Sequence, residues 1–245
     1  MKLWKDVPCD AALARDLAGR MDLPLPVVSI LAGRGMVTAD AIERFVKPRL
    51  SDLSDPFLLP GMDKAVARVW RAIQAGESIA VYGDYDVDGV TSTALLTTVL
   101  KHLGARVAPF LPRRVEEGYG LSPEGLERCL TTCAPRLIVT VDCGTSSGAV
   151  VEMARKAGVD VVVTDHHEAS GPLSEAVAVV NPRLGGTPAS LSLAGVGVAF
   201  KFCHALLKQG RDRDCARAGA LDLRQYLDLV AAGTVADVVP LVDEN

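Results

Sequence analysis

Three aspartates alternate directly after an apolar segment in the first half of the sequence. Asp84, Asp86 and Asp88 follow the segment 79–81, whose residues are Ile, Ala and Val. Aspartate is disfavoured in strands, and carboxylates are seldom buried without partners. Carboxylates held close together repel one another and do not all ionise unless cations neutralise them. The pattern therefore indicates a cation-binding site where a buried strand ends.

Acids and imidazoles also follow three later apolar segments, 137–141, 161–164 and 233–236. The residues that follow them are Asp142, Asp165, His166, His167 and Asp237. In parallel α/β sheets, ligands collect beyond the carboxyl ends of the strands. We therefore expect these side chains and the three earlier aspartates to meet at one edge of a sheet, each group at a strand end.

Oxygen ligands with one or two imidazoles suit Mn²⁺ or Mg²⁺ better than zinc. Two such ions, about 3.5–4 Å apart and bridged by one carboxylate, form a clamp for phosphoester hydrolysis. Taken singly, Asp142 could be a helix N-cap, Asp88 with Gly89 could form a turn, and the histidines could be surface residues. Their joint occurrence after four apolar segments favours the metal site.

The segments that must position these residues alternate between strands and helices from about residue 62 onward. Strands are predicted over 78–82, 106–111, 137–141, 159–164 and 176–180. Helices are predicted over 63–75, 91–103, 123–133, 147–157, 193–208 and 221–232. This alternation is typical of the α/β class with a doubly wound, mainly parallel sheet.

Residues 1–60 have a different character and predict a helical N-terminal appendage. Short helices are expected over 11–20, 26–33 and 39–46, and prolines then interrupt the chain up to residue 60. We therefore predict an appendage at 1–60 and a catalytic domain at 61–245.

The composition is that of an ordinary globular α/β protein with an acidic balance. The chain has 245 residues, 49% of them hydrophobic, and a formal net charge of −4. Nucleic-acid binders are usually basic, so a polyanion would need a local basic patch or cations held by the carboxylates. Six cysteines form no C-x-x-C pair, Lys2, Lys5 and Asp6 interrupt any signal peptide, and no window reaches about 18 apolar residues. We expect a reduced, cytoplasmic protein without membrane contact.

Together these residues resemble the motifs of the DHH phosphoesterase superfamily, whose naming triplet matches Asp165, His166 and His167. Within that superfamily the resemblance is to the RecJ single-strand-specific exonucleases, and it covers essentially the whole chain. The stretches that carry it are residues 55–59, 62–65, 82–92, 117–122, 193–201 and 233–241. The triplet alone is moderately specific, whereas these stretches together are highly specific.

The resemblance implies two Mn²⁺ or Mg²⁺ ions and stepwise hydrolysis of single-stranded DNA from the 5′ end, in recombination and repair. Asp86 and Asp142 would hold one ion, with Asp84 close by as a catalytic residue. The ligands implied for the other ion are Asp88, Asp142, His166 and Asp237. Asp142 would bridge the ions and would itself be catalytic, His167 would act near the scissile phosphate, and Arg114 would contact a phosphate. Arg114 could instead be a solvated member of a basic pair.

The resemblance also implies partners and further domains. The partners would be single-stranded DNA, a single-strand-binding protein and a RecQ-type helicase. RecJ proteins continue past the fourth motif into a second substrate domain and an OB-type domain, whereas this sequence stops at Asn245. We therefore expect it to represent the N-terminal catalytic part.

Three alternative functions are open to these residues. One is a DHH phosphoesterase that acts on pyrophosphate, short oligonucleotides or cyclic dinucleotides. Pyrophosphatase-like members carry a histidine upstream of the first acids, but here the nearest one, His102, follows them. The second is an inactive scaffold, which would have lost ligands that this sequence retains. The third is a receiver-like signalling domain, which would lack His166 and His167. The retained ligands, the two histidines and the lack of an upstream histidine together favour the nuclease.

Two features near the motifs have structural explanations. Cys143, next to Asp142, has no evident base partner, so we expect it to pack in the core rather than act as a nucleophile. Gly195 and Gly197 precede an apolar helix and could form a phosphate-facing helix start, but close packing against the sheet is favoured.

Overall fold

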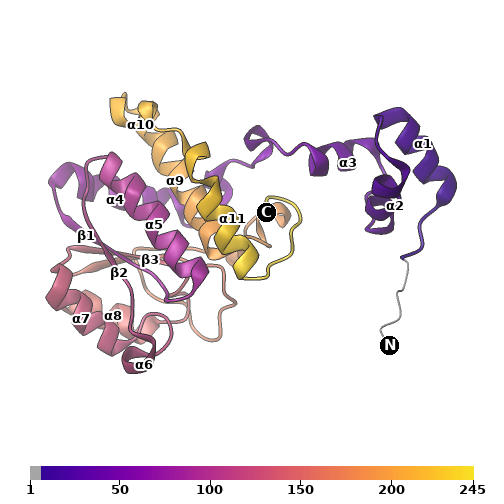
Figure 1. Cartoon of the computed structure of the whole chain (residues 1–245). Coiled ribbons are helices and arrows are strands. Elements are labelled where there is room, and N and C mark those ends of the chain that lie inside the picture. Colours follow the sequence, from indigo (N-terminus) through magenta and orange to yellow (C-terminus); the bar gives the residue numbers. More distant parts are fainter. Residues whose placement is uncertain (1–6) are drawn as a thin grey trace. The chain divides into compact units, whose positions relative to one another are not determined.

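The structure is a computed structural model that describes residues 7–245 (Figure 1). Residues 1–6, on which the expectation about a signal peptide depends, lie outside the described residues. The chain divides into two compact units, Met1–Leu53 and Ser54–Asn245. Each unit has its own core and is described by itself.

The first unit is a small helical cluster. Its helices are α1 (Ala11–Met21), α2 (Leu25–Gly33), α3 (Ala39–Val46) and the 3₁₀ helix η1 (Leu50–Asp52). The Asp10 carboxylate accepts backbone N–H groups at the start of α1, and the Thr38 hydroxyl does the same for α3. The helices bury a core of Ala14, Leu17, Val28, Leu31 and Ile42. The helical character predicted for this region is therefore present.

The second unit is built on a five-stranded sheet in the order β2-β1-β3-β4-β5, in which every pair is parallel. The strands are β1 (Ser78–Tyr82), β2 (Arg106–Phe110), β3 (Leu137–Val141), β4 (Asp160–Thr164) and β5 (Ala178–Val180). The central strand β3 is buried along its whole length, as expected for a parallel strand covered on both faces. The predicted α/β class and parallel sheet are confirmed.

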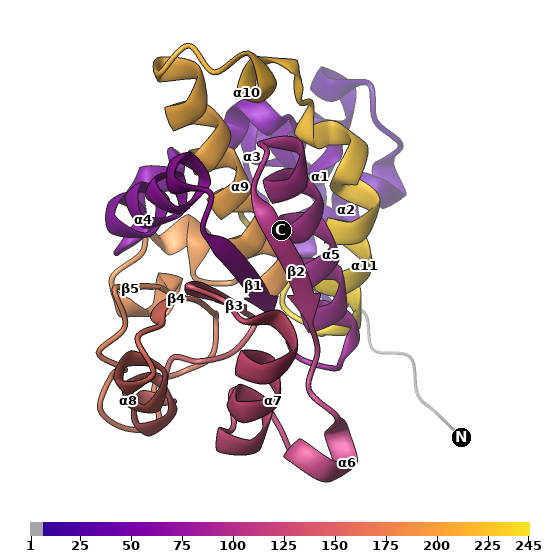
Figure 2. The ribbon, with the colours of Figure 1, turned by 90° about the vertical axis from the view of Figure 1, so that its left-hand side faces the viewer.

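Helices cover both faces of the sheet (Figures 1 and 2). One layer consists of α4 (Met62–Ala75), α5 (Val87–His102), α9 (Gly195–Asp212) and α11 (Leu227–Ala236). The other consists of α6 (Arg114–Glu117), α7 (Pro123–Cys133) and α8 (Gly148–Lys156). Side chains alternate along each strand, so Ala80 and Tyr82 of β1 pack toward α7 and α8, while Ile79 and Val81 point the other way. The short elements that remain are η2 (Pro56–Leu58), η3 (Pro182–Leu184), η4 (Pro188–Ser190), α10 (Ala216–Ala220) and η5 (Leu223–Tyr226).

The division between the units falls after Leu53, whereas the sequence places it near residue 60. Residues 54–60 belong to the second unit, and ionic and polar bonds join them to its helix α9. The buried Lys201 ammonium on α9 donates to the Ser54 carbonyl and hydroxyl, and Lys208 pairs with Asp55 at 2.6 Å. Prolines therefore interrupt helices here without marking the boundary.

Two elements differ from the prediction near the expected site. Helix α5 begins at Val87 rather than near residue 91, because the Asp86 carboxylate caps it by accepting the Gly89 N–H. Residues 233–236 are the last turn of α11, so the expectation that Asp237 follows a strand is wrong. A four-residue apolar run carries too little periodicity to tell a strand from a helix end. Within residues 7–245, no helix has the length and apolar character needed to cross a membrane.

Candidate metal centre

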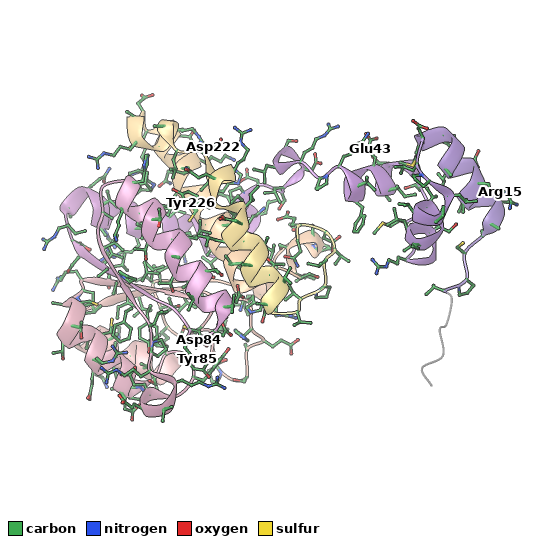
Figure 3. The ribbon with its side chains drawn as sticks, viewed as in Figure 1. Arg15, Glu43, Asp84, Tyr85, Asp222 and Tyr226 are labelled. Atoms are coloured by element: carbon green, nitrogen blue, oxygen red, sulfur yellow. The ribbon has the colours of Figure 1, made fainter. Side chains whose placement is uncertain are left out.

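The carboxyl edge of the sheet collects the acids and imidazoles that the sequence singles out. Asp84 and Tyr85 lie just past β1, at the start of α5 (Figure 3). Asp142 follows β3, and the Asp165–His167 triplet follows β4. Because these strands are parallel neighbours, their last residues lie side by side at one edge.

The three alternating aspartates have different environments. Asp84 is fully buried, and one of its carboxylate oxygens accepts the Tyr85 N–H at 2.6 Å. Asp86 is exposed and caps α5. Asp88 is buried in the first turn of α5, where it accepts the N–H groups of Gly195 and Val196 at 2.6 and 2.8 Å. Asp88 therefore also joins the start of α9 to the site.

The imidazole of His166 is the point on which several carboxylates converge. Its Nε2 lies 3.2 Å from Oδ1 of Asp142, 3.6 Å from Oδ2 of Asp237 and 3.8 Å from Oδ2 of Asp88. Two sets of side chains are close enough to hold an ion, their ligand atoms all within 4.8 Å of one another. The sets are Asp142 with His166 and His167, and Asp88 with His166 and Asp237. Neither set contains Asp84 or Asp86.

His166 belongs to both sets, but it cannot bridge two ions. One imidazole nitrogen offers a single lone pair, whereas a carboxylate has two oxygens and can bind two ions at once. A bridge would therefore have to come from a carboxylate, and Asp142 is the one nearest to His166.

Burial and mutual repulsion make the ionised carboxylates costly in the absence of a cation. Burial, and then the neighbouring Asp88 and Asp86 charges, raise the pKa of Asp142 to about 10. Burial also raises the pKa of Asp84 and of Asp88. A divalent cation would reverse this cost, because it favours the charged form of every carboxylate around it.

Unpaired buried atoms show that the centre fits a cation. Within residues 7–245, Oδ2 of Asp84, Oδ1 of Asp142 and Nε2 of His166 are buried without a hydrogen-bond partner. Buried polar atoms normally have partners, and these three are lone-pair donors at the one edge where the acids converge. A hard divalent ion with oxygen and imidazole ligands matches this donor set.

Asp165 differs from the other carboxylates at this edge of the sheet, because its hydrogen bonds hold the backbone of the triplet. One of its oxygens accepts the backbone N–H groups of His166 and His167 and lies 2.8 Å from Nδ1 of His167, while the other accepts the Thr145 N–H. Burial alone would raise the pKa of Asp165, but the bonds from His167 and Thr145 outweigh burial and hold the pKa below its ordinary value. Asp165 thus shapes the turn that presents the two histidines.

His167 is held between two partners, Asp165 and Tyr119. Its Nε2 lies 3.0 Å from the hydroxyl of Tyr119, a residue of the loop after α6. The hydrogen bond to Asp165 raises the pKa of His167 and so favours the imidazolium form. Tyr119 packs edge-on against Tyr85, and the Arg114 guanidinium lies 5.0 Å from the centroid of the Tyr85 ring. Arg114 therefore contacts Tyr85, and His167 contacts Tyr119. The two tyrosine rings pack against each other beside the carboxylates.

Two glycines allow the carboxylates to approach the helices closely. A Cβ atom on Gly195 would lie 2.5 Å from Oδ1 of Asp142, and one on Gly233 would lie 2.8 Å from Oδ1 of Asp88. The sequence favoured close packing of Gly195 and Gly197 against the sheet, but the close neighbour of Gly195 is the Asp142 carboxylate beyond the end of β3, and that of Gly197 is the Leu193 side chain. Cys143 is buried in the core, as expected.

The structure brings together Asp88, Asp142, His166 and Asp237, and it places Asp84, Asp86, Arg114 and His167 around them. Asp142 is not a helix cap, because Ser147 precedes α8. Residues that the sequence did not single out are Thr145, Asn181 and Arg183, whereas Tyr119 belongs to the stretch 117–122 that carries the resemblance. The hydrogen bonds of Thr145, Asn181 and Arg183 to the triplet join residues 14 to 20 positions apart, so their contacts are not visible in the local sequence.

Comparison with known proteins shows the family to which the chain belongs. Residues 78–234 match the model of the DHH family, N-terminal domain. The chain is 39% identical over 243 residues to a single-stranded-DNA-specific exonuclease RecJ of Bacillus subtilis, covering 99% of this chain and 29% of that protein. It is 44% identical over 240 residues to the RecJ exonuclease of Escherichia coli, covering 94% of this chain and 41% of that protein. The chain thus spans less than half the length of these curated relatives.

Solved structures of RecJ proteins share the fold of this chain. The RecJ structure from Thermus thermophilus in complex with Mn²⁺ superposes with a TM-score of 0.73 at 34% identity, over 96% of this chain and 32% of that one. A second structure, of an exonuclease RecJ bound to manganese, has a TM-score of 0.68 at 40% identity, over 80% and 47% of the two chains. The family match covers all five strands and every converging acid except Asp237, and on this evidence the chain belongs to the DHH family.

Proposed function

We propose that the second unit, Ser54–Asn245, forms the catalytic unit of a metal-dependent exonuclease that hydrolyses single-stranded DNA from the 5′ end. The observation that carries the proposal is the cluster of buried, unpaired ligand atoms on Asp84, Asp142 and His166 at the carboxyl edge of the sheet. Similarity to proteins named single-stranded-DNA-specific exonucleases supports the substrate, and the family implies recombination and repair as the setting.

The residues divide into metal ligands and groups that act on the substrate. The ligands for two Mn²⁺ or Mg²⁺ ions are Asp86, Asp88, Asp142, His166 and Asp237. The ions, when bound, would lower the pKa of a water molecule and neutralise charge on the phosphoryl oxygens. RecJ structures with Mn²⁺ and with Mg²⁺ support this choice of metals.

The chain's own residues would bind and orient the scissile phosphate. The imidazolium form of His167, favoured by Asp165, has N–H groups on both nitrogens, so Nε2 can donate to Tyr119 or to a phosphate oxygen. Arg114, held against Tyr85, can make fork-like contacts to a second phosphate oxygen. Asp84, buried with one unpaired oxygen, would orient the attacking water.

A cleavage assay tests the proposal. The chain is incubated with Mn²⁺ and an oligonucleotide labelled at either end, with a blunt duplex and a cyclic dinucleotide in parallel and Asp142→Ala as control. We expect loss of the single strand only, beginning at the 5′ end, and no loss in the variant. Equal cleavage of the duplex, preference for the cyclic dinucleotide, or full activity of the variant would contradict the proposal. The single-strand-binding protein, the RecQ-type helicase and the cytoplasmic location remain predictions from the sequence.

A further inference from the structure

The segment that follows the edge strand β5 contacts the turn that presents the two histidines. In the parallel pairing of β4 with β5, Thr164 is opposite Val180. The next residues of the two strands, Asp165 and Asn181, therefore leave the sheet side by side. The Asp165 N–H donates to the Val180 carbonyl, which extends the ladder to the start of the triplet.

Asn181 is fully buried, and every polar atom of its side chain has a partner. Its Nδ2 donates to the His167 carbonyl and to the Thr145 hydroxyl, both at 2.9 Å. Its Oδ1 accepts the Arg183 N–H at 2.9 Å, which fixes the orientation of the amide. Thr145 in turn donates its N–H to Asp165, so Asn181 closes a network around the triplet.

Arg183 anchors the other histidine. Pro182 restricts Asn181 to an extended backbone, with φ −145° and ψ 121°, and begins the 3₁₀ helix η3. This turn directs Arg183 back toward the site, where its Nε donates to the His166 carbonyl at 2.7 Å. Asn181 thus binds the backbone carbonyl of His167, and Arg183 binds that of His166.

These backbone contacts matter because Nε2 of His166 has no hydrogen-bond partner in the described part of the chain. Its direction therefore depends on the backbone of the triplet and on packing, rather than on a side-chain bond. The nitrogen lies 3.2–3.8 Å from three carboxylates, so a small rotation of the turn would change which oxygens it can share an ion with. Groups that orient metal ligands from behind generally tune metal affinity.

We propose that Asn181 and Arg183 are positioning residues that hold His166 and His167 in the geometry required for metal and phosphate binding. This inference rests on the proposed function for its biological meaning. Its physical content, the orientation of a ligand imidazole, can be measured without any nuclease activity.

Calorimetric titration with Mn²⁺ and imidazole ¹⁵N spectra test the inference on Asn181→Asp and Arg183→Gln. The first variant keeps the size of the side chain but puts an oxygen against the His167 carbonyl. The second removes the Nε donor at a position whose side chain is 41% exposed, where we expect a substitution to cost little stability. The chain has only four histidines, so His102 and His204 serve as internal references.

We expect each variant to bind Mn²⁺ about 10–100-fold more weakly than the wild type. The spectra should change for His166 and His167 only, and Arg183→Lys should recover part of the affinity. The matched control is Asn245→Asp, because the Asn245 amide also donates to two carbonyls, those of Ser192 and Pro240. This control should bind Mn²⁺ as the wild type does.

Unchanged Mn²⁺ affinity in both folded variants would overturn the inference, as would an equal loss in Asn245→Asp. Absence of Mn²⁺ binding by the wild type would also overturn it. A wild type that binds Mn²⁺ but leaves DNA intact would refute the proposed function alone, since the affinity differences between variants would still report positioning.

Discussion

The two ends of the sheet both contain buried charges, but their surroundings differ. At the amino end, Arg68 of α4 is buried and pairs with Glu77, just before β1, at 2.7 Å and with Asp160, the first residue of β4, at 2.6 Å. At the carboxyl end, Asp142 is buried among other carboxylates, and its Oδ1 has no hydrogen-bond partner within residues 7–245.

The pairing of the charges distinguishes a cluster that supports the fold from one that can bind a ligand. At the amino end the Arg68 guanidinium pairs with carboxylates of opposite charge, which connects a helix to the starts of two strands, although Nη1 of Arg68 has no hydrogen-bond partner among the described residues. The carboxyl end gathers like charges, and burial, followed by mutual repulsion, raises the pKa of Asp142 and Asp88, which is unfavourable for the fold by itself. Titratable groups perturbed in this way are typical of functional sites. A buried charge is therefore informative about function when its partner is missing.

The largest expected effect comes from removing the Asp142 charge while keeping its shape. Asp142→Asn should lower the hydrolysis rate by about 10³-fold or more, because loss of metal ions forfeits several kcal/mol of transition-state stabilisation. The thermal stability of the metal-free protein should not fall, since the amide replaces a carboxyl group whose ionised form is unfavourable at this buried position. Single-turnover cleavage and calorimetry measure the two effects.

Asp160→Asn is the matched control for that variant at the other end of the sheet. It should keep the hydrolysis rate and lose stability, because Arg68 would lose an ionic partner. If the two variants behaved alike in both measurements, the contrast between the two ends would be wrong.

A smaller effect is expected from Arg68→Met, which fills the buried volume but removes the charge. Breaking a buried ion pair costs about 3–5 kcal/mol, and exposure of the carboxylate partners reduces this to about 2 kcal/mol. Urea unfolding should show this loss, while the affinity for Mn²⁺ stays unchanged. A weaker Mn²⁺ affinity in the folded variant would mean that the two ends are coupled.

The smallest effect concerns a second paired charge, Glu244 with Lys201, at 2.8 Å. Burial would raise the pKa of Glu244, but hydrogen bonds from Lys201 and Ser54 outweigh it and hold the pKa below the ordinary value of 4.5. The pair therefore stabilises the fold above pH 4.5, and this contribution is lost as the pH falls through the lowered pKa.

Glu244→Gln should remove about 1 kcal/mol of stability at pH 7 and reduce the dependence of stability on pH below 4.5. Denaturant unfolding at a series of pH values measures both effects. Identical acid profiles for the variant and the wild type would show that this pair does not contribute.

The sequence alone predicted the sheet and most of the site, for a local reason. Apolar strands alternate with amphipathic helices, and in parallel sheets the residue after each strand lies at one known edge. Asp84, Asp88, Asp142 and His166 could therefore be expected to meet before any coordinates were known. Asp237 also lies at this edge, but it follows helix α11 rather than a strand. The sequence did not reveal this, because a short apolar run does not distinguish a strand from a helix end.

Only the tertiary structure decided which residues orient the site. Tyr119, Asn181 and Arg183 contact the histidines across 14 to 48 positions of the chain, distances over which sequence spacing carries no information. Gly195 looked like a packing residue, but its missing side chain and its N–H adjoin two different carboxylates. The sequence determined which chemical groups are present and the edge where they gather, because strand direction is a local property. Their orientation depends on contacts between distant segments, which form only when the chain is folded.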